Sequence, residues 1–400
     1  MRRLIYIFII GLLLCSYTWA DGSRYASKSL LSEGKWVKIR VDKTGIYKLS
    51  YADLKNMGFS DPSKVSVHGY GGWPLDEDFS KEYIDDVPST PVWRGSDYLL
   101  FYGKGPVKWE YDSSSQTFVH TNNPYSLYGY YFVTDATPTN DMTSVAQASG
   151  ATNRITTYDD YLVHEQELVS LAKSGRELYG EDFSGATPRT LSTFSSIPGI
   201  TNEDAKVTMS FVSKVTSGTG VASLSINQSN VLDFSIRSNR EEYVKALEGV
   251  STAVWKGEKS EKNSVVVSYN SASHNNVRLN YVRLHFKRTL QPYGAYTFFR
   301  SIASIGNVSR FVVQGANANT LVFDVTDAQR VRLMETELNG SELTFSIPAG
   351  TLREFVLVRT DQSFISPEVV GEVENQNLHA LEQKDMIIIA AKAFQTQAER

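Results

Sequence analysis

The chain has 400 residues, with 40 Lys and Arg against 44 Asp and Glu, a single Cys, 22 Tyr and 19 Phe. The mildly acidic balance argues against a nucleic-acid-binding protein, because phosphate binding needs clustered Lys and Arg. One cysteine excludes an intramolecular disulfide, and the many aromatic residues favour β-strands. The chain is too long for one ordinary core, so we expect two or three domains.

The first twenty residues have the pattern of an export signal. Two arginines precede an apolar run over residues 4–14, which is too short to span a bilayer comfortably. Thr18 and Ala20 occupy the −3 and −1 positions of a cleavage site. We therefore predict a cleavable signal peptide over residues 1–20 and an exported mature chain.

Two alternatives stay open for this segment. The first is an uncleaved membrane anchor, against which the short apolar run and the polar residues after it both argue. The second is a lipoprotein acylated at Cys15, although the residue before such a cysteine is usually small and here it is Leu14. Ordinary cleavage leaves 38 basic against 44 acidic residues, a net charge of −6, and no cysteine. Such a chain fits a bacterial envelope.

The first folded segment begins with a half-buried strand over residues 36–41. Its apolar residues Val37, Ile39 and Val41 alternate with charged ones, which places them on one face. A second strand is expected over residues 45–49, after a Lys-Thr-Gly turn.

A short helix is predicted to follow these strands. Ser50 is a good N-cap, and Asp53 at the third helical position completes a shortened capping box. Leu49 and Leu54 are spaced as a hydrophobic staple, and Gly58 is placed to end the helix.

The rest of a small β-rich N-terminal domain over residues 21–145 is predicted from aromatic and apolar runs. A hairpin is expected over 108–120, with Asp112 and a serine run at its turn, and 76–91 reads as an acidic loop. Further strands are expected over 65–68, 98–102 and 128–133.

The region over residues 146–370 alternates short strands and polar turns, which is typical of an antiparallel β-sandwich. Asn339-Gly340 is a type I′ hairpin signal, and the apolar face switches within 277–286, which indicates a β-bulge or a strand covered on both faces. Only 241–247 looks helical in the latter half of the region. Strands are expected over 207–215, 222–226, 264–269, 277–288, 310–314, 321–325, 331–337, 342–347 and 354–359.

The end of the chain has a different pattern. After a polar linker over 371–384, residues 385–391 form an unbroken apolar run, as in a parallel strand buried on both faces. Residues 394–400 begin an amphipathic helix. A parallel strand needs a crossover partner, so we expect the start of a truncated α/β domain over 385–400. The alternative is a terminal strand and helix docked on the sandwich.

No catalytic, cofactor-binding or metal-binding residue can be assigned from motifs. His164-Glu165 begins like a zinc-peptidase motif but lacks the second histidine. No nucleophile elbow, P-loop or dinucleotide fingerprint is present, and residues 69–72 read as a tight turn and not a phosphate loop. The sequence leaves a Ser–His–Asp triad open, because its members need not be neighbours.

Four acidic groups are possible Ca²⁺ sites, but none has regular ligand spacing, so solvated surface is the favoured interpretation. These groups lie at residues 76–78, 85–86, 159–160 and 181–182.

A series of segments resembles the N-terminal half of the PorU family of type IX secretion system sortases, which are gingipain-like cysteine peptidases. The resemblance covers nearly the whole mature chain, and it rests on the order and spacing of the segments. They are 43–49, 67–72, 98–106 with Trp109, 125–134, His164-Glu165, 173–181, 324–327 and 375–379.

The resemblance implies a protein peripheral to the outer membrane, at the cell surface of a Gram-negative bacterium. Members of the family remove C-terminal sorting domains from secreted cargo and attach the cargo to lipopolysaccharide. They use a His and a Cys in a caspase-like α/β domain, which would begin here at residue 385. Both catalytic residues would then lie beyond Arg400, so these 400 residues would be a non-catalytic part of the enzyme, without a cofactor. The expected partners are other type IX outer-membrane components and, through the peptidase domain, secreted cargo.

Two other functions stay open. A stand-alone surface-binding β-protein could hold a glycan or protein ligand with exposed aromatics such as Trp73, Trp93 and Trp109, although such tryptophans are more often core residues. An independent hydrolase would need a site that no motif marks.

Overall fold

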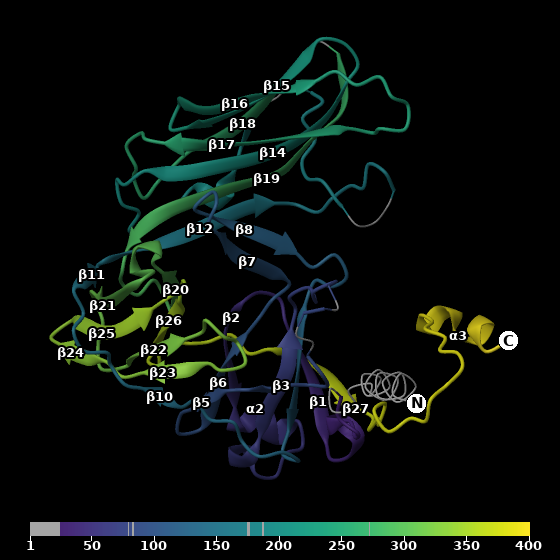
Figure 1. The fold of residues 1–400 in the computed structure, drawn as a ribbon, viewed down its shortest axis with the longest axis vertical. Helices are drawn as coiled ribbons and strands as arrows, with labels where there is room; N and C mark the ends of the chain where they lie inside the picture. The colour runs from purple at the N-terminus through teal and green to yellow at the C-terminus, as the bar shows by residue number, and fades with distance from the viewer. Residues whose placement is uncertain (1–24, 79, 82–83, 174–176, 186–187, 272) are drawn as a thin grey trace, which may run out of the picture.

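The computed structural model describes residues 25–78, 80–81, 84–173, 177–185, 188–271 and 273–400. The predicted signal peptide, with Cys15, lies outside the described residues. In the described part of the chain the fold is mainly β, with several antiparallel sheets and few helices, as predicted (Figure 1).

The N-terminal domain consists of a five-stranded and a three-stranded sheet that enclose one core. The sheet orders are β27-β1-β9-β3-β4 and β2-β6-β5. The predicted strand over 36–41 is β1, and its alternating Val37, Ile39 and Val41 are buried in this core. The strands are β1 (Trp36–Val41), β2 (Gly45–Ser50), β3 (Ser66–Gly71), β4 (Ser89–Thr90), β5 (Val92–Arg94), β6 (Tyr98–Gly103), β9 (Gly129–Thr134) and β27 (Glu368–Val373).

Helix α2 (Tyr51–Asn56) confirms the predicted capping box. Ser50 Oγ accepts a hydrogen bond from the Asp53 backbone N–H at 3.0 Å, and Asp53 Oδ2 accepts one from the Ser50 N–H at 3.3 Å. Leu49 and Leu54 are both buried in the core of the domain. Gly58, just beyond the helix, has a positive φ of 89°.

The first sandwich core lies between part of a nine-stranded sheet and a four-stranded sheet of order β13-β18-β15-β16. The nine-stranded sheet has the order β10-β23-β22-β26-β20-β12-β19-β14-β17. Its strands at this end are β12 (Thr157–Glu165), β14 (Ala205–Val215), β17 (Leu247–Trp255) and β19 (His274–Thr289), and the facing strands are β13 (Arg189–Thr190), β15 (Thr219–Ile226), β16 (Ser229–Arg237) and β18 (Val265–Asn270).

A second sandwich core lies at the other end of the same nine-stranded sheet. Strands β20, β22 and β26 contribute to it, facing a four-stranded sheet of order β11-β21-β25-β24. The region over 146–370 therefore holds two cores that share one sheet. The strands are β10 (Ser144–Val145), β11 (Asn153–Ile155), β20 (Tyr296–Arg300), β21 (Asn307–Val313), β22 (Thr320–Asp324), β23 (Arg332–Met334), β24 (Glu337–Asn339), β25 (Glu342–Ala349) and β26 (Glu354–Arg359).

The N-terminal domain packs on the nine-stranded sheet that the two sandwich cores share. Ile46, Leu100 and Tyr102 share a separate buried cluster with Phe323 of β22 and Val356 of β26. The predicted hairpin, β7 (Val107–Asp112) with β8 (Thr117–Asn122), reaches toward the first core and lies next to β12 (Figure 1). Its turn is fixed as expected, because Asp112 accepts hydrogen bonds from Ser114 and Ser115.

In the sandwich region the structure confirms the predicted bulge but not the predicted turn type. The bulge in β19 is confirmed, since Tyr281 pairs with Ser210 and Leu279 with Phe211, which leaves Asn280 as the extra residue. The predicted hairpin joins β24 and β25, but its loop lies one residue later than Asn339-Gly340. The two loop residues are Gly340, with a φ of 60°, and Ser341, which has no positive φ, so the turn lacks the two positive φ angles of type I′.

The predicted helix over 241–247 is wrong. The segment is a loop that leads into edge strand β17, which pairs with β14. Strands β12, β16, β17, β20 and β27 were not predicted, and neither were the short strands β4, β5, β10, β11 and β13. Tertiary pairing overrides local propensity in these segments.

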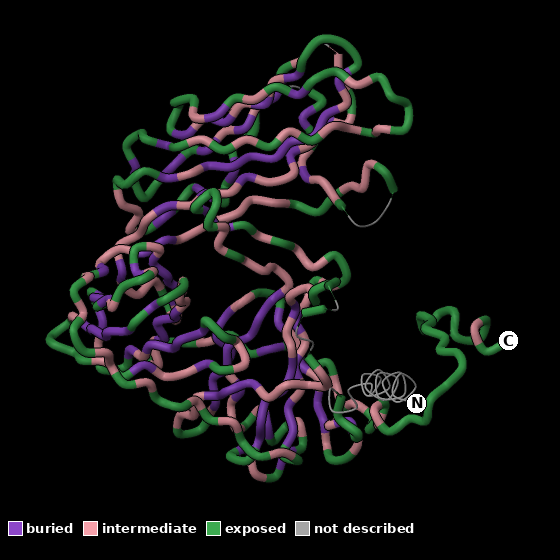
Figure 2. Tube along the Cα trace, in the orientation of Figure 1, coloured by how far each residue is buried: buried purple, intermediate pink, exposed green. Residues whose placement is uncertain are grey.

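The final segment also differs from the prediction. Residues 371–373, assigned to the linker, belong to β27, which pairs antiparallel with β1. Residues 385–391 form no strand and are exposed, with Ile389 95% accessible (Figure 2). A strand needs a hydrogen-bonded neighbour, and none of the described residues supplies one here. The predicted helix is present only as a 3₁₀ turn (Lys392–Phe394) and α3 (Gln395–Ala398).

Candidate functional site

A pocket of about 430 Å³ lies where the N-terminal domain meets the nine-stranded sheet. The N-terminal domain contributes Asp42, Trp73 and Tyr102, and hairpin strand β7 contributes Trp109. Eight aromatic side chains, three acidic and three basic ones are among the residues that line it. Strands β12 and β20 form its polar wall.

The aromatic side chains hold the hairpin on the sheet beside the pocket. The Trp109 ring stacks on Tyr161 of β12, with centroids 4.0 Å apart and an interplanar angle of 18°. Phe118 of β8 packs edge-on against His285 at 5.1 Å. Lys206 Nζ donates a hydrogen bond to Ser115 O at 2.6 Å, which ties the turn of the hairpin to β14. Packed strands therefore form much of the pocket wall, and the loop residues Asp42, Trp73 and Tyr293 complete it.

Arg300 of β20 is the central charge of the wall, although only 1% of its side chain is exposed. Its Nε lies 2.6 Å from Glu354 Oε1 and its Nη1 lies 3.6 Å from Asp160 Oδ1. Burial alone would lower the pKa of Arg300, but Tyr161, Glu354 and Asp160 together raise it above its ordinary value. The guanidinium therefore stays charged and neutralises the carboxylates around it.

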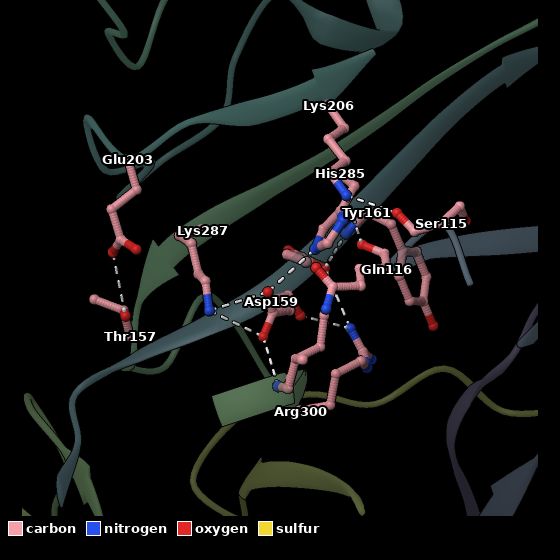
Figure 3. A network of polar contacts seen from close by, with 12 residues as sticks. Ser115, Gln116, Thr157, Asp159, Tyr161, Glu203, Lys206, His285, Lys287 and Arg300 are labelled. Atoms are coloured by element: carbon pink, nitrogen blue, oxygen red, sulfur yellow. Dashed lines mark hydrogen bonds and ion pairs between the residues drawn. The ribbon is translucent and has the colours of Figure 1, made fainter. Parts of the chain in front are cut away.

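Asp159 anchors a second layer of charges behind this wall (Figure 3). Its carboxylate contacts His285 Nε2 at 3.1 Å and Lys287 Nζ at 3.0 Å, and accepts a hydrogen bond from the Ile302 N–H at 2.8 Å. Burial raises the pKa of Asp159, but the His285 hydrogen bond and the Lys287 charge outweigh it, so the pKa is lowered. Solvated surface was therefore the wrong interpretation for residues 159–160.

Two of the three tryptophans named from the sequence line this pocket. Trp73 and Trp109 come from different parts of the chain and meet at its wall. Trp93 lies elsewhere and packs against Tyr98, with ring centroids 5.9 Å apart.

His164-Glu165 does not form a metal site with another histidine in the described part of the chain. His164 Nε2 contacts Glu181 at 2.7 Å, whereas Glu165 contacts His120 at 2.9 Å. The side chains of His164 and Glu165 therefore have different partners and do not form one site. Among the described residues, no group of three or more His, Cys, Asp or Glu side chains is placed to hold a metal ion.

The other acidic groups make contacts within the protein, and some of their side chains are exposed. Asp182 pairs with Arg278 at 3.2 Å, and Asp85 and Asp86 accept backbone hydrogen bonds from Ala26 and Leu30. The group at 76–78 is exposed and makes local bonds, including the pair of Asp76 with Lys81.

The glycine-rich segment 69–72 forms the bulged end of β3, and not the tight turn predicted. Gly71 has a φ of 86°, and a Cβ on Gly72 would lie 2.8 Å from the Gly105 backbone. The register of β3 with β9 shifts between His68 and Gly71. Close approach of two backbones therefore requires these glycines.

A serine, a histidine and an aspartate do meet at one place that no sequence spacing marks. His379 Nδ1 lies 2.7 Å from Ser29 Oγ, and His379 Nε2 lies 2.6 Å from Asp85 Oδ1. Ser29 is only 6% exposed, and its hydroxyl also accepts the His379 backbone N–H. These contacts fasten residues 375–379, which we call the strap, and they leave the serine hydroxyl engaged and enclosed. We therefore assign the cluster a structural role.

No helix in the described part of the chain is both long and apolar enough to cross a bilayer.

The fold and the pocket define a β-rich protein in which a small N-terminal domain packs on a sheet shared by two sandwich cores. It is similar to the crystal structure of dimeric latent PorU from Porphyromonas gingivalis, with a TM-score of 0.87 and 31% sequence identity. The match covers 94% of this chain and 36% of that one, so the chain spans about a third of the solved PorU. The chain therefore has a PorU-like fold, and the resemblance found in the sequence is confirmed.

The remaining comparisons add no assignment. No family model matches the chain, and no curated protein matches it. A structure of infectious bursal disease virus Gx strain aligns with 84% of this chain and 85% of that one, at 9% identity and a TM-score of 0.19, which carries no argument.

Proposed function

We propose that this chain is the non-catalytic N-terminal part of a type IX secretion system sortase of the PorU type. The observation that supports the proposal is the match to latent PorU over 94% of this chain at 31% identity. In such a sortase the peptidase domain would cleave the C-terminal sorting domain of secreted cargo and attach the cargo to lipopolysaccharide. The part described here would support that domain.

The strap gives a structural basis for the proposed support of the peptidase domain. Strand β27 closes the N-terminal sheet beside β1, and the strap fastens the chain to residues 29–34 immediately afterwards. Whatever follows residue 384 would therefore leave from a fixed point on the N-terminal domain. We propose other type IX outer-membrane components as partners, and the outer surface of a Gram-negative bacterium as the location, after export behind a cleaved signal peptide.

The alternative of a stand-alone surface-binding protein is less well supported. The similarity to PorU extends over nearly the whole chain and is not confined to one sandwich, which is more than a shared β-architecture would give.

The gene provides the first test. We expect the reading frame to continue past the codon for Arg400 and to encode a His and a Cys in a caspase-like domain. A stop codon directly after Arg400 would contradict the sortase proposal for this product.

A chromosomal deletion provides the second test. Removal of the coding region for residues 25–384 in frame should leave secreted cargo with its C-terminal sorting domain and without a lipopolysaccharide anchor, as read by mass and by electrophoretic mobility. Normally processed cargo in that strain would exclude a supporting role.

A further inference from the structure

We propose that the pocket between the N-terminal domain and the nine-stranded sheet binds a saccharide of one or two sugar units. The proposal concerns the binding properties of these residues, and it holds whether or not the protein takes part in cargo sorting. Four properties of the pocket support it: size, aromatic lining, unpaired hydrogen-bond donors and balanced charge.

The pocket has the size and rigidity of a small-ligand site. Its volume of about 430 Å³ falls within the range of roughly 300–1,000 Å³ that is common for such sites. Residues from β6, β7, β12, β20 and β26 form much of its lining, so a large part of the cavity would be present before binding. A preformed site avoids the ordering cost of a loop that closes on its ligand.

The lining offers flat apolar surfaces beside polar groups. Trp73, Trp109 and Tyr296 line the pocket together with Tyr161. One face of a pyranose ring exposes mainly C–H groups, which pack on aromatic rings, while its edge carries hydroxyls. Tryptophan and tyrosine suit such a ligand because each combines a large apolar face with one hydrogen-bonding group.

Several of these indole N–H and tyrosine hydroxyl groups have no hydrogen-bond partner in the protein. Trp73 Nε1 is buried without a hydrogen bond. Among the described residues, the hydroxyls of Tyr102, Tyr161 and Tyr296 also form no hydrogen bond with the protein. A buried donor without an acceptor costs free energy, so donors left open around one cavity favour a ligand rich in oxygen acceptors. A sugar has several such oxygens at close spacing.

The charges argue against a strongly ionic ligand. Three acidic and three basic side chains line the pocket, and four of them, Asp160, Glu354, Arg288 and Arg300, pair with one another. Arg288 Nη1 lies 2.8 Å from Asp160 Oδ2, and Arg300 lies between Asp160 and Glu354. A phosphate or a polyamine would meet repulsion from one half of this set. Sugar hydroxyls can donate to the carboxylates and accept from the guanidinium groups without disturbing the balance.

The test is retention of the purified chain on an array of neutral, amino and uronic-acid oligosaccharides. The best-retained oligosaccharide is then titrated in solution, with tryptophan fluorescence as the signal, because Trp73 and Trp109 line the pocket. Two variants probe the site: Trp73→Ala removes an aromatic face with its N–H, and Tyr161→Phe removes one hydroxyl that has no partner in the protein. Tyr243→Phe, on a side chain that is 88% exposed, is the matched control.

We expect the wild-type chain to retain at least one oligosaccharide. Tyr161→Phe should weaken binding by about three- to tenfold, the value of one neutral hydrogen bond, and Trp73→Ala should weaken it by at least about tenfold. Tyr243→Phe should bind like wild type, and thermal unfolding should show that the variants are folded. The proposal is overturned if no oligosaccharide is retained, or if either pocket variant binds like wild type.

Discussion

His379 Nε2 lies 2.6 Å from Asp85 Oδ1, although 294 residues separate the two in the chain. The strap that carries His379 reaches residues near the start of the folded chain as well. Asn375 Nδ2 donates hydrogen bonds to Leu31 O at 3.0 Å and to Gly34 O at 2.9 Å. Asp85 also accepts a hydrogen bond from the Ala26 N–H, so one loop carboxylate contacts two segments that lie almost at opposite ends of the sequence.

The strap should be held most firmly in mildly acidic solution. The hydrogen bond to Asp85 raises the pKa of His379 above 6.5, so its contribution is present below that pH and is lost as the pH rises through the raised value. The hydrogen bonds from Ala26 and His379 lower the pKa of Asp85, so its contribution is lost only as the pH falls below about 4. We expect hydrogen exchange in peptides over 26–34 and 375–381, corrected for intrinsic rates, to quicken between pH 5.5 and pH 8.5.

A pair of histidine variants separates this effect from general loosening. His379→Ala should remove the pH dependence of exchange in both peptides. His274→Ala should keep it, since His274 contacts backbone oxygens of Ser271 and Ser184, away from the strap. Equal protection of the strap at both pH values would show that the pair with Asp85 does not hold it.

Replacement of Arg300 should destabilise the protein strongly. Arg300→Leu leaves Asp160 and Glu354 beside the pocket without the buried cation between them, and loss of one partner from a buried charge group costs about 3–5 kcal/mol. Urea unfolding measures this as a lower midpoint.

The matched control is Arg330→Leu, because Arg330 also pairs with a carboxylate, that of Asp327, but is 84% exposed. Exposed pairs contribute roughly 0–1 kcal/mol, so this variant should unfold near the wild-type midpoint. Similar losses in both variants would mean that burial does not determine the role of Arg300.

The sequence predicts well those elements whose signals are local. The alternation of Val37, Ile39 and Val41 sets the buried face of β1, and Ser50 with Asp53 marks the start of α2, because both patterns depend on near neighbours. The predicted helix over 241–247 failed because β14 is available as a partner for the edge strand that begins at Leu247. Residues 385–391 likewise have a strand sequence without a neighbouring strand.

The pocket could be predicted only in part. Trp73 and Trp109 were named as aromatic candidates, but their meeting depends on how the N-terminal domain packs against β12, which no periodicity encodes. The buried role of Asp159 depends on His285 and Lys287, more than a hundred residues away. A pair of adjacent aspartates indicates solvated surface until the partners on the next strand are known.

Removal of the positive charge of Lys104 should stabilise the protein. Its side chain is buried between Tyr70 and Trp73, and burial lowers its pKa to about 8. A lowered lysine pKa means that the charged form costs stability below pH 8, and that this cost fades as the pH rises toward 10.5. We expect Lys104→Met to be more stable than wild type by roughly 1–3 kcal/mol at pH 6.5, and by less at pH 9.5, in urea unfolding.

Lys48→Met provides the comparison for this effect. Lys48 also lies over an aromatic ring, 4.2 Å from the centroid of Tyr98, but its side chain is only partly buried. This variant should differ little from wild type at either pH. A difference between Lys104→Met and wild type that stays constant from pH 6.5 to pH 9.5 would contradict the titration of Lys104.

Phe345 should be among the most sensitive positions of the second sandwich core. Its ring is stacked on Phe311 with centroids 5.0 Å apart and meets Phe355 edge-on at 5.1 Å, and none of its surface is exposed. Phe345→Ala would leave a cavity between paired strands that cannot collapse, so we expect a loss of about 3–5 kcal/mol in urea unfolding. Leu338→Ala on the adjoining β24, where the side chain is 42% exposed, should lose less than about 1 kcal/mol. A small loss for Phe345→Ala would mean that this core is loosely packed and that the first core alone stabilises the shared sheet.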